Sequence, residues 1–235
     1  MVSGISYLSY LAQSYLFKRR GLLLTGILGG LYSSTAASVV IGKQARSASD
    51  TSIVSASLIA ATTMMYLRLL VLIAALGHYQ AALQLLTPFS IIVASSAVVT
   101  LVLYRQRKHA AHDRHIQASK HPLELPTALF FAAQFVFFAA LTERVIQQFG
   151  AQGLHFLAFV VGLTDIDPFI LSLLAGTFHT EPSLVMSAIM IASGSNNLLK
   201  AIYIAGLARN RSILPAFGWL IVSFLFSLGY VYFLQ

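Results

Sequence analysis

Long apolar stretches recur along the whole sequence, and they constrain the fold more than any other feature. Residues 52–76, 89–104, 127–149, 182–207 and 214–234 each approach or exceed the roughly 17–25 residues with which a helix crosses a bilayer, and residues 5–17 form a further apolar segment that is short for a span. Only 9% of the residues are charged, against about 25% in soluble domains. The pattern predicts an all-α, polytopic membrane protein, not a barrel of alternating strands. The lipid bilayer is then its first partner.

Two further apolar segments, 21–42 and 153–176, carry polar residues at their centres. In the second segment Thr164, Asp165 or Asp167 can cap a new helix, and Pro168 suits a first helical position because its missing N–H is not needed there. We therefore predict a broken helix in each segment, the later one resuming at Asp167 or Pro168. The polar residues are Ser33, Ser34 and Thr35 in the first segment, and Thr164, Asp165 and Asp167 in the second.

The second half of the chain repeats the first at an offset of 132 residues without a gap. This offset places Gly30 on Gly162 and Arg68 on Lys200. It also places Ser33 on Asp165 and Thr35 on Asp167. We predict two membrane repeats, 1–105 and 127–235, joined by a basic cytoplasmic linker at 106–126.

The positive charges indicate how the chain crosses the membrane. If all the apolar segments crossed, cationic loops would fall on both faces, against the positive-inside rule. If 21–42 and 153–176 each enter and leave by one face, the cationic loops all share one side. Each half of such a segment would be about 13 Å long at ~1.5 Å per residue, half of a ~30 Å core. The cationic residues are Lys18, Arg19, Arg20, Lys43, Arg46, Arg105, Arg107, Lys108, Arg114, Lys120, Arg209 and Arg211.

The resulting fold has two inverted repeats, each with three transmembrane helices and one re-entrant broken helix. Three crossings per repeat is an odd number, so the repeats must be upside down relative to each other. Transporters of this plan hold their substrate where broken helices meet near the midplane. The formal charge of +8 then reflects the orientation of the chain in the membrane, and we expect no nucleic-acid partner.

An acidic pair inside a membrane segment is expensive, and it indicates a functional site. We expect Asp165 and Asp167 to bind a metal cation or a proton. Charge balance would come from Arg68 and Lys200. Carboxylate and hydroxyl oxygens together suit a hard cation. The rest of the shell would come from Thr164, Ser33, Ser34, Thr35, Asn196 and Asn197.

Structural roles compete with these functional ones. An aspartate can simply cap a helix, although a cap needs one carboxylate and not two. The segment around Gly30 can serve helix packing, and Asn196 can bond a neighbouring helix. Arg68 and Lys200 can snorkel to an interface. The linker histidines His109, His112, His115 and His121 fit a solvated loop better than a metal site.

Four stretches together resemble the uncharacterised membrane domain that commonly follows the MgtC/SapB domain in bacterial and archaeal proteins. They are 21–36, 66–72, 162–167 and 196–200, and the resemblance extends over nearly the whole chain. It implies a multi-pass protein of the prokaryotic cytoplasmic (inner) membrane. The MgtC association with magnesium homeostasis is its only hint of a substrate.

The functional expectation is a secondary transporter or channel for a small ion or solute, with a cation such as Mg²⁺, Na⁺ or H⁺ favoured. No nucleophile–base pair, Walker loop or dinucleotide fingerprint is present, so we do not expect an enzyme. We expect no cofactor beyond a bound cation, and a homodimer is compatible with the sequence. The alternatives are a regulatory or assembly module of the membrane and, behind it, a lipid-modifying enzyme.

Overall fold

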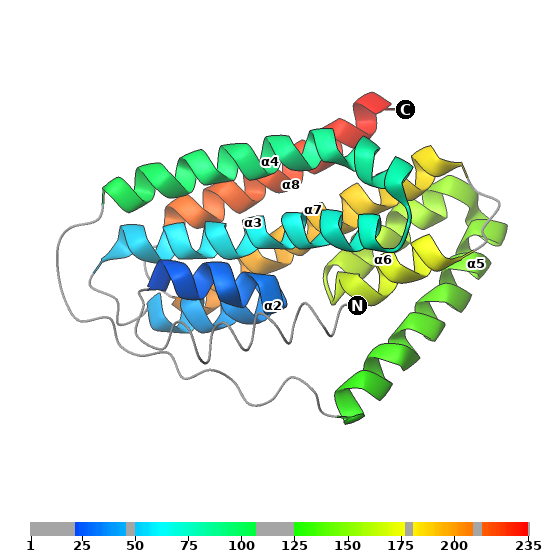
Figure 1. Ribbon diagram of the computed structural model, residues 1–235, viewed down its shortest axis with the longest axis horizontal. Coiled ribbons are helices and arrows are strands. Elements are labelled where there is room, and N and C mark those ends of the chain that lie inside the picture. Colours follow the sequence, from blue (N-terminus) through cyan, green and yellow to red (C-terminus); the bar gives the residue numbers. More distant parts are fainter. Residues whose placement is uncertain (1–21, 46–49, 107–124, 177–180, 209–212, 235) are drawn as a thin grey trace. The chain divides into compact units, whose positions relative to one another are not determined.

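The computed structural model describes residues 22–45, 50–106, 125–176, 181–208 and 213–234 (Figure 1). Within these ranges the chain forms seven helices and no strand, which confirms the all-α class. The helices are α2 (Leu22–Gln44), α3 (Thr51–Ala75), α4 (Tyr79–Arg105), α5 (Leu125–Gly162), α6 (Ile166–Ala175), α7 (Pro182–Ala208) and α8 (Leu214–Leu234).

Five of the described helices, α2, α3, α4, α5 and α8, are long and apolar enough to cross a membrane. α7 is 27 residues long, but it is not among them because its centre is rich in Gly, Ser and Asn. Large apolar side chains are exposed, such as Val71 (57%), Phe156 (71%) and Phe233 (87%). A surface of this kind fits lipid and not water.

The helices pack into two compact units made of interleaved segments. Unit 1 combines Met1–Leu72, Phe89–Pro122 and Lys200–Ile221, and unit 2 combines Ile73–Pro88, Leu123–Leu199 and Val222–Gln235. α3, α4, α7 and α8 each contribute to both units. The predicted repeats are consecutive in sequence and the units are not, so the repeat boundaries stay a prediction.

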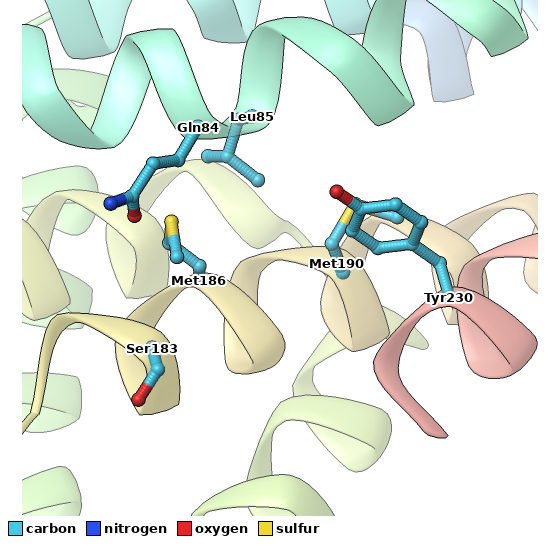
Figure 2. A pocket seen from close by; sticks show the side chains of 6 residues that line it. All are labelled: Gln84, Leu85, Ser183, Met186, Met190 and Tyr230. Atoms are coloured by element: carbon cyan, nitrogen blue, oxygen red, sulfur yellow. The ribbon is translucent and has the colours of Figure 1, made fainter. Parts of the chain in front are cut away.

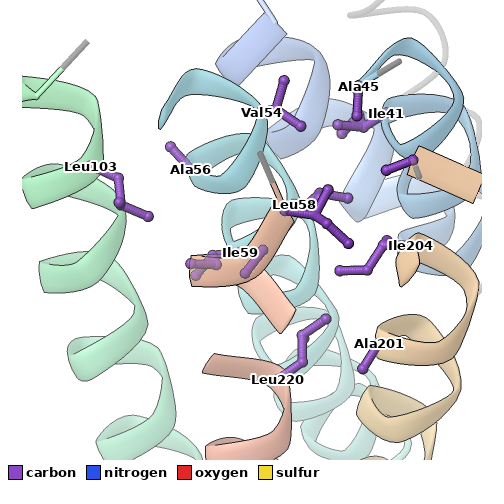
Figure 3. Close-up of a cluster of buried hydrophobic side chains, with 13 residues drawn as sticks. Ile41, Ala45, Val54, Ala56, Leu58, Ile59, Leu103, Ala201, Ile204 and Leu220 are labelled. Atoms are coloured by element: carbon purple, nitrogen blue, oxygen red, sulfur yellow. The ribbon is translucent and has the colours of Figure 1, made fainter. Parts of the chain in front are cut away.

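Unit 1 is built on an apolar core to which five helices contribute (Figure 3). The end of α2 supplies Ile41, and the start of α3 supplies Leu58 and Ile59; all three side chains are fully buried. The indole Nε1 of Trp219 donates a hydrogen bond of 2.8 Å to Ser96 Oγ and so joins α8 to α4. The whole cluster is Ile41, Ala45, Val54, Ala56, Leu58, Ile59, Leu103, Ala201, Ile204, Ala208, Ile213, Ala216 and Leu220.

α2 is interrupted at Ser33, whose φ of −154° and ψ of 107° are not helical. Before this point α2 runs parallel to α3, since Gly26 lies against the Ser57 backbone and Gly30 against that of Ala61. Each glycine lacks the Cβ that would collide with the α3 backbone. The first half of α2 can therefore approach α3 closely.

After the interruption α2 turns back. Ala45 belongs to the same core as Val54 and Leu58, close to where α3 begins. In a straight helix Gly26 and Ala45 would be about 28 Å apart at ~1.5 Å per residue. Ala45 instead shares a core with Val54 and Leu58, which flank in sequence the Ser57 backbone that Gly26 lies against. The segment is therefore a helical hairpin, with its tip at Ser33 (Figure 1).

Unit 2 contains a second hairpin. α5 is interrupted at Gly150, whose φ of 59° lies in the left-handed region that favours glycine. The continuation, 151–162, ends at Gly162, and α6 begins at Ile166, close to the predicted start at Asp167 or Pro168. α5 and α6 pack against each other, with the rings of Phe138 and Phe169 6.0 Å apart in an edge-to-face arrangement.

Much of the predicted positive charge lies outside the described residues. This applies to Lys18, Arg19, Arg20, Arg46, Arg107, Lys108, Arg114, Lys120, Arg209 and Arg211, and to the histidines of the linker. The predicted assignment of these residues to one face of a membrane therefore stays a prediction.

Candidate functional site

The break between α5 and α6 closes with a tight turn. Leu163 N donates to Val160 O at 3.1 Å, and Thr164 N donates to Val161 O at 2.8 Å. The Thr164 hydroxyl donates to the same Val161 oxygen at 2.7 Å. These bonds satisfy the last carbonyls of α5.

The side-chain amide of Asn196 on α7 donates hydrogen bonds to two further backbone carbonyls at this turn. Its Nδ2 donates to Gly162 O at 3.0 Å and to Thr164 O at 3.2 Å, and its side chain is only 2% exposed. Gly162 permits the approach, because a Cβ there would clash with Ser195 Oγ and with the Ala192 carbonyl oxygen. Asn196 therefore has the structural role named as its alternative, a hydrogen bond between helices.

The two carboxylates at the break have different positions. Asp165 is exposed and is the N-cap of α6, with Oδ1 accepting a 3.2 Å hydrogen bond from Asp167 N. Asp167 lies in the first turn of α6 and is 7% exposed. The capping role is thus filled by Asp165, and Asp167 is a buried acidic residue next to the positive end of a helix dipole.

The break in unit 1 has a similar geometry. Ser33 Oγ accepts a 3.3 Å hydrogen bond from Ala36 N and so caps the second half of α2. Arg68 of α3 donates from Nη1 to Tyr32 O at 2.7 Å, and it is 8% exposed. Ser34 is buried and Thr35 is half-buried at the tip of this hairpin.

The offset of 132 residues brings equivalent groups together. Ser33 and Asp165 both cap a helix, and the carbonyls of Tyr32 and Thr164 both accept a bond from a side chain of a later helix. The donors are not equivalent, since Arg68 corresponds to Lys200 and not to Asn196. The backbone at the Ser33 break is therefore bonded by the Arg68 guanidinium, and the backbone at the acidic break is bonded by the neutral amide of Asn196.

Lys200 is fully buried, and its Nζ donates a 3.1 Å hydrogen bond to Met65 Sδ within unit 1. Arg68 is nearly as buried, so snorkelling to an interface describes neither side chain. That Lys200 and Arg68 balance the negative charge of the two aspartates remains a prediction.

The predicted site residues fall in both units. Thr164, Asp165, Asp167, Asn196 and the fully buried Asn197 belong to unit 2, and Ser33 to Thr35 belong to unit 1. Among the described residues no three His, Asp or Glu side chains group as a metal site. A cation at Asp165 and Asp167 would thus need hydroxyl, amide or backbone oxygens as its other ligands, and the contribution of Ser33, Ser34 and Thr35 stays a prediction.

A cavity of about 300 Å³ in unit 2 was not predicted from the sequence (Figure 2). Its lining comes from α4, α7 and α8. The spacing of Ser183, Met186 and Met190 along one face of α7 is the signal that could have found it. The lining residues are Gln84, Leu85, Ser183, Met186, Met190 and Tyr230.

Five span-length apolar helices with exposed apolar side chains define a multi-pass helical membrane protein. Within this class, the chain belongs to the family described as "Domain of unknown function (DUF4010)", which matches residues 1–208. The predicted resemblance to an uncharacterised membrane domain is thereby confirmed, and the association with MgtC/SapB stays an expectation.

One relative is an uncharacterized protein of Aquifex aeolicus (strain VF5). It is 26% identical over 188 residues, which cover 77% of this chain and 80% of the relative. No solved structure matches the chain.

Proposed function

We propose that the protein is a secondary transporter or a selective channel for a small ion, with a cation favoured, and that the acidic break in unit 2 is its binding site. The observation that carries this proposal is the burial of Asp167 in the first turn of α6 while Asp165 does the capping. A second carboxylate at this position is not needed to begin the helix.

The energetics favour a positively charged occupant. A carboxylate deep in a membrane protein is costly unless protein, water or a cation compensates it. The positive end of the α6 dipole compensates part of its charge. A cation beside Asp167 and Asp165 would add to this compensation, and the exposed position of Asp165 would leave it accessible to an arriving ion.

The lengths of the helices support a re-entrant hairpin. The ten residues of α6 rise about 15 Å, and residues 151–162 rise about 18 Å, at ~1.5 Å per residue. Each is close to half of a ~30 Å hydrocarbon core, so the break would lie near the midplane. Inverted repeats and a hydroxyl-bearing second tip at Ser33 to Thr35 complete this proposal, on the transporter plan of paired broken helices.

Asp167→Asn tests the site. The purified variant, reconstituted in proteoliposomes with dyes for Mg²⁺, Na⁺ and H⁺, should lose about tenfold or more of whichever flux the wild type shows. Loss of one charged ligand is worth about 1.5–3 kcal/mol, and ~1.4 kcal/mol is tenfold in affinity. The matched control is Asp50→Asn, because Asp50 caps the start of α3 through a 2.9 Å bond from Ser52 N and should not affect flux.

Unchanged flux in a folded Asp167→Asn protein removes the site from the mechanism. Absence of all three fluxes in the wild type, together with purification of a stoichiometric membrane partner, favours the regulatory or assembly module instead.

A further inference from the structure

Five side chains form a continuous stripe along α7. At about 100° per residue, Asn196, Ser193, Met186, Asn197 and Met190 fall within an arc of about 120°. All five belong to unit 2. The stripe extends from the cavity lining to the break, which Asn196 contacts directly.

Burial increases along α7 from its start toward this stripe. Ser183 at the start of α7 is exposed, Met186 is half-buried and Met190 is 1% exposed. In Figure 2 the side chains of Gln84 and Met186 extend toward each other from α4 and α7, and Tyr230 reaches over Met190 from α8. The cavity therefore lies beside the part of α7 where the exposed start of the helix gives way to buried residues.

Ser193 follows Met190 by three residues, about 4.5 Å further along the helix. Its side chain is fully buried, and its hydroxyl has no hydrogen-bond partner in the part of the chain that the structure describes. A helical serine usually bonds the carbonyl four residues back, as Ser187 and Ser227 do here. A buried hydroxyl without such a bond is placed to accept one from water or a ligand.

We infer that this face of α7 is the access route along which a hydrated cation passes from the cavity to the acidic break. The inference rests on the proposed function. At ~30 Å³ per water, a cavity of about 300 Å³ has room for about ten waters, enough for an ion with its first hydration shell.

The donors along the route determine where the ion loses its water. The cavity lining offers amide, hydroxyl and thioether groups without a carboxylate, and these do not replace a tightly held hydration shell. A carboxylate lies at the outer end of the route, where Glu181 Oε2 accepts a 3.3 Å hydrogen bond from Ser183 Oγ, and the next carboxylates are those at the break. From Ser183 to Asn196 the helix rises about 20 Å, which reaches past the middle of a ~30 Å core.

Single cysteines test this route, because the natural chain contains none. Met190→Cys and Ser193→Cys proteins in proteoliposomes are treated with a cationic and an anionic methanethiosulfonate of similar size, which are membrane-impermeant. Both positions should react, and Ser193→Cys should favour the cationic reagent about tenfold relative to free thiol, because it lies next to the acidic break. The control is Ala188→Cys, which is fully buried but about 160° around the helix from Met190 and should stay unlabelled.

An unreactive Ser193→Cys that labels fully after denaturation overturns the route, as does equal labelling at Ala188→Cys or a preference for the anionic reagent. Labelling is read separately from flux. Cation-selective labelling without flux would support the water-filled route and contradict the proposed transport function. Flux without labelling would support transport and contradict this route.

Discussion

Asn196 connects α7 to the break between α5 and α6 through a single side chain. Its one amide nitrogen bonds the carbonyl at the end of α5 and a carbonyl within the break, where the helical bonding pattern is interrupted. Buried peptide groups in a membrane must be satisfied within the protein. The acidic break therefore depends on α7 for its shape.

Replacing Asn196 with Leu should lower the free energy of unfolding by about 1–3 kcal/mol, because one buried and one partly buried carbonyl lose their donor. SDS titration from mixed micelles measures the change. The control is Gln152→Leu, an exposed position that should stay within about 0.5 kcal/mol of the wild type. Equal stability of Asn196→Leu and wild type would show that water replaces the amide.

At the scale of the element, glycine decides how closely the broken helices approach their neighbours. A Cβ on Gly30 would lie 2.6 Å from Ala61 Cα, and one on Gly162 would lie 2.9 Å from Ser195 Cβ. The two positions are equivalent under the offset of 132 residues. In both units a glycine just before the break lies against a later helix.

Gly30→Ala should destabilise the protein by about 1–3 kcal/mol, since the α2 hairpin has to move away from the α3 backbone. The matched control is Gly206→Ala, where nothing lies within 4 Å of the added carbon and helix propensity should add up to ~1 kcal/mol. Thermal unfolding in detergent compares the two. A Gly30→Ala protein that melts at the wild-type temperature contradicts close packing of this hairpin.

At the scale of the whole molecule, the arrangement across the membrane can be tested directly. Single cysteines at Lys43 and Arg105 should react from the cytoplasmic face only, and those at Gln80, Gln152 and Glu181 from the opposite face only. Labelling of intact and permeabilised cells with an impermeant maleimide measures this. Gln152 and Glu181 on opposite faces would show that 151–175 crosses the membrane instead of turning back.

The sequence predicted the helical class, both breaks and a set of three candidate caps that includes Asp165, because apolar length and cap chemistry are local properties; it did not predict Ser33 as a cap. It treated Asp165 and Asp167 alike, since only the packing of α6 buries one and exposes the other. It also missed the cavity, because Gln84, Met186 and Tyr230 are distant in sequence and meet only when three helices pack. The interleaved units likewise arise from tertiary contacts that no local pattern encodes.

The two hydrogen bonds from Asn196 to the break have a mechanical consequence. Because one side chain ties the end of α5 and the turn before α6 to α7, the end of α5 and this turn should move with α7 as a single body in any opening and closing cycle. We then expect the chain to bend at Gly150, where a left-handed backbone conformation interrupts α5. There is open space around this glycine, since a Cβ built on it would meet nothing within 4 Å. The pivot of such a cycle would lie at the far end of the hairpin from the acidic residues.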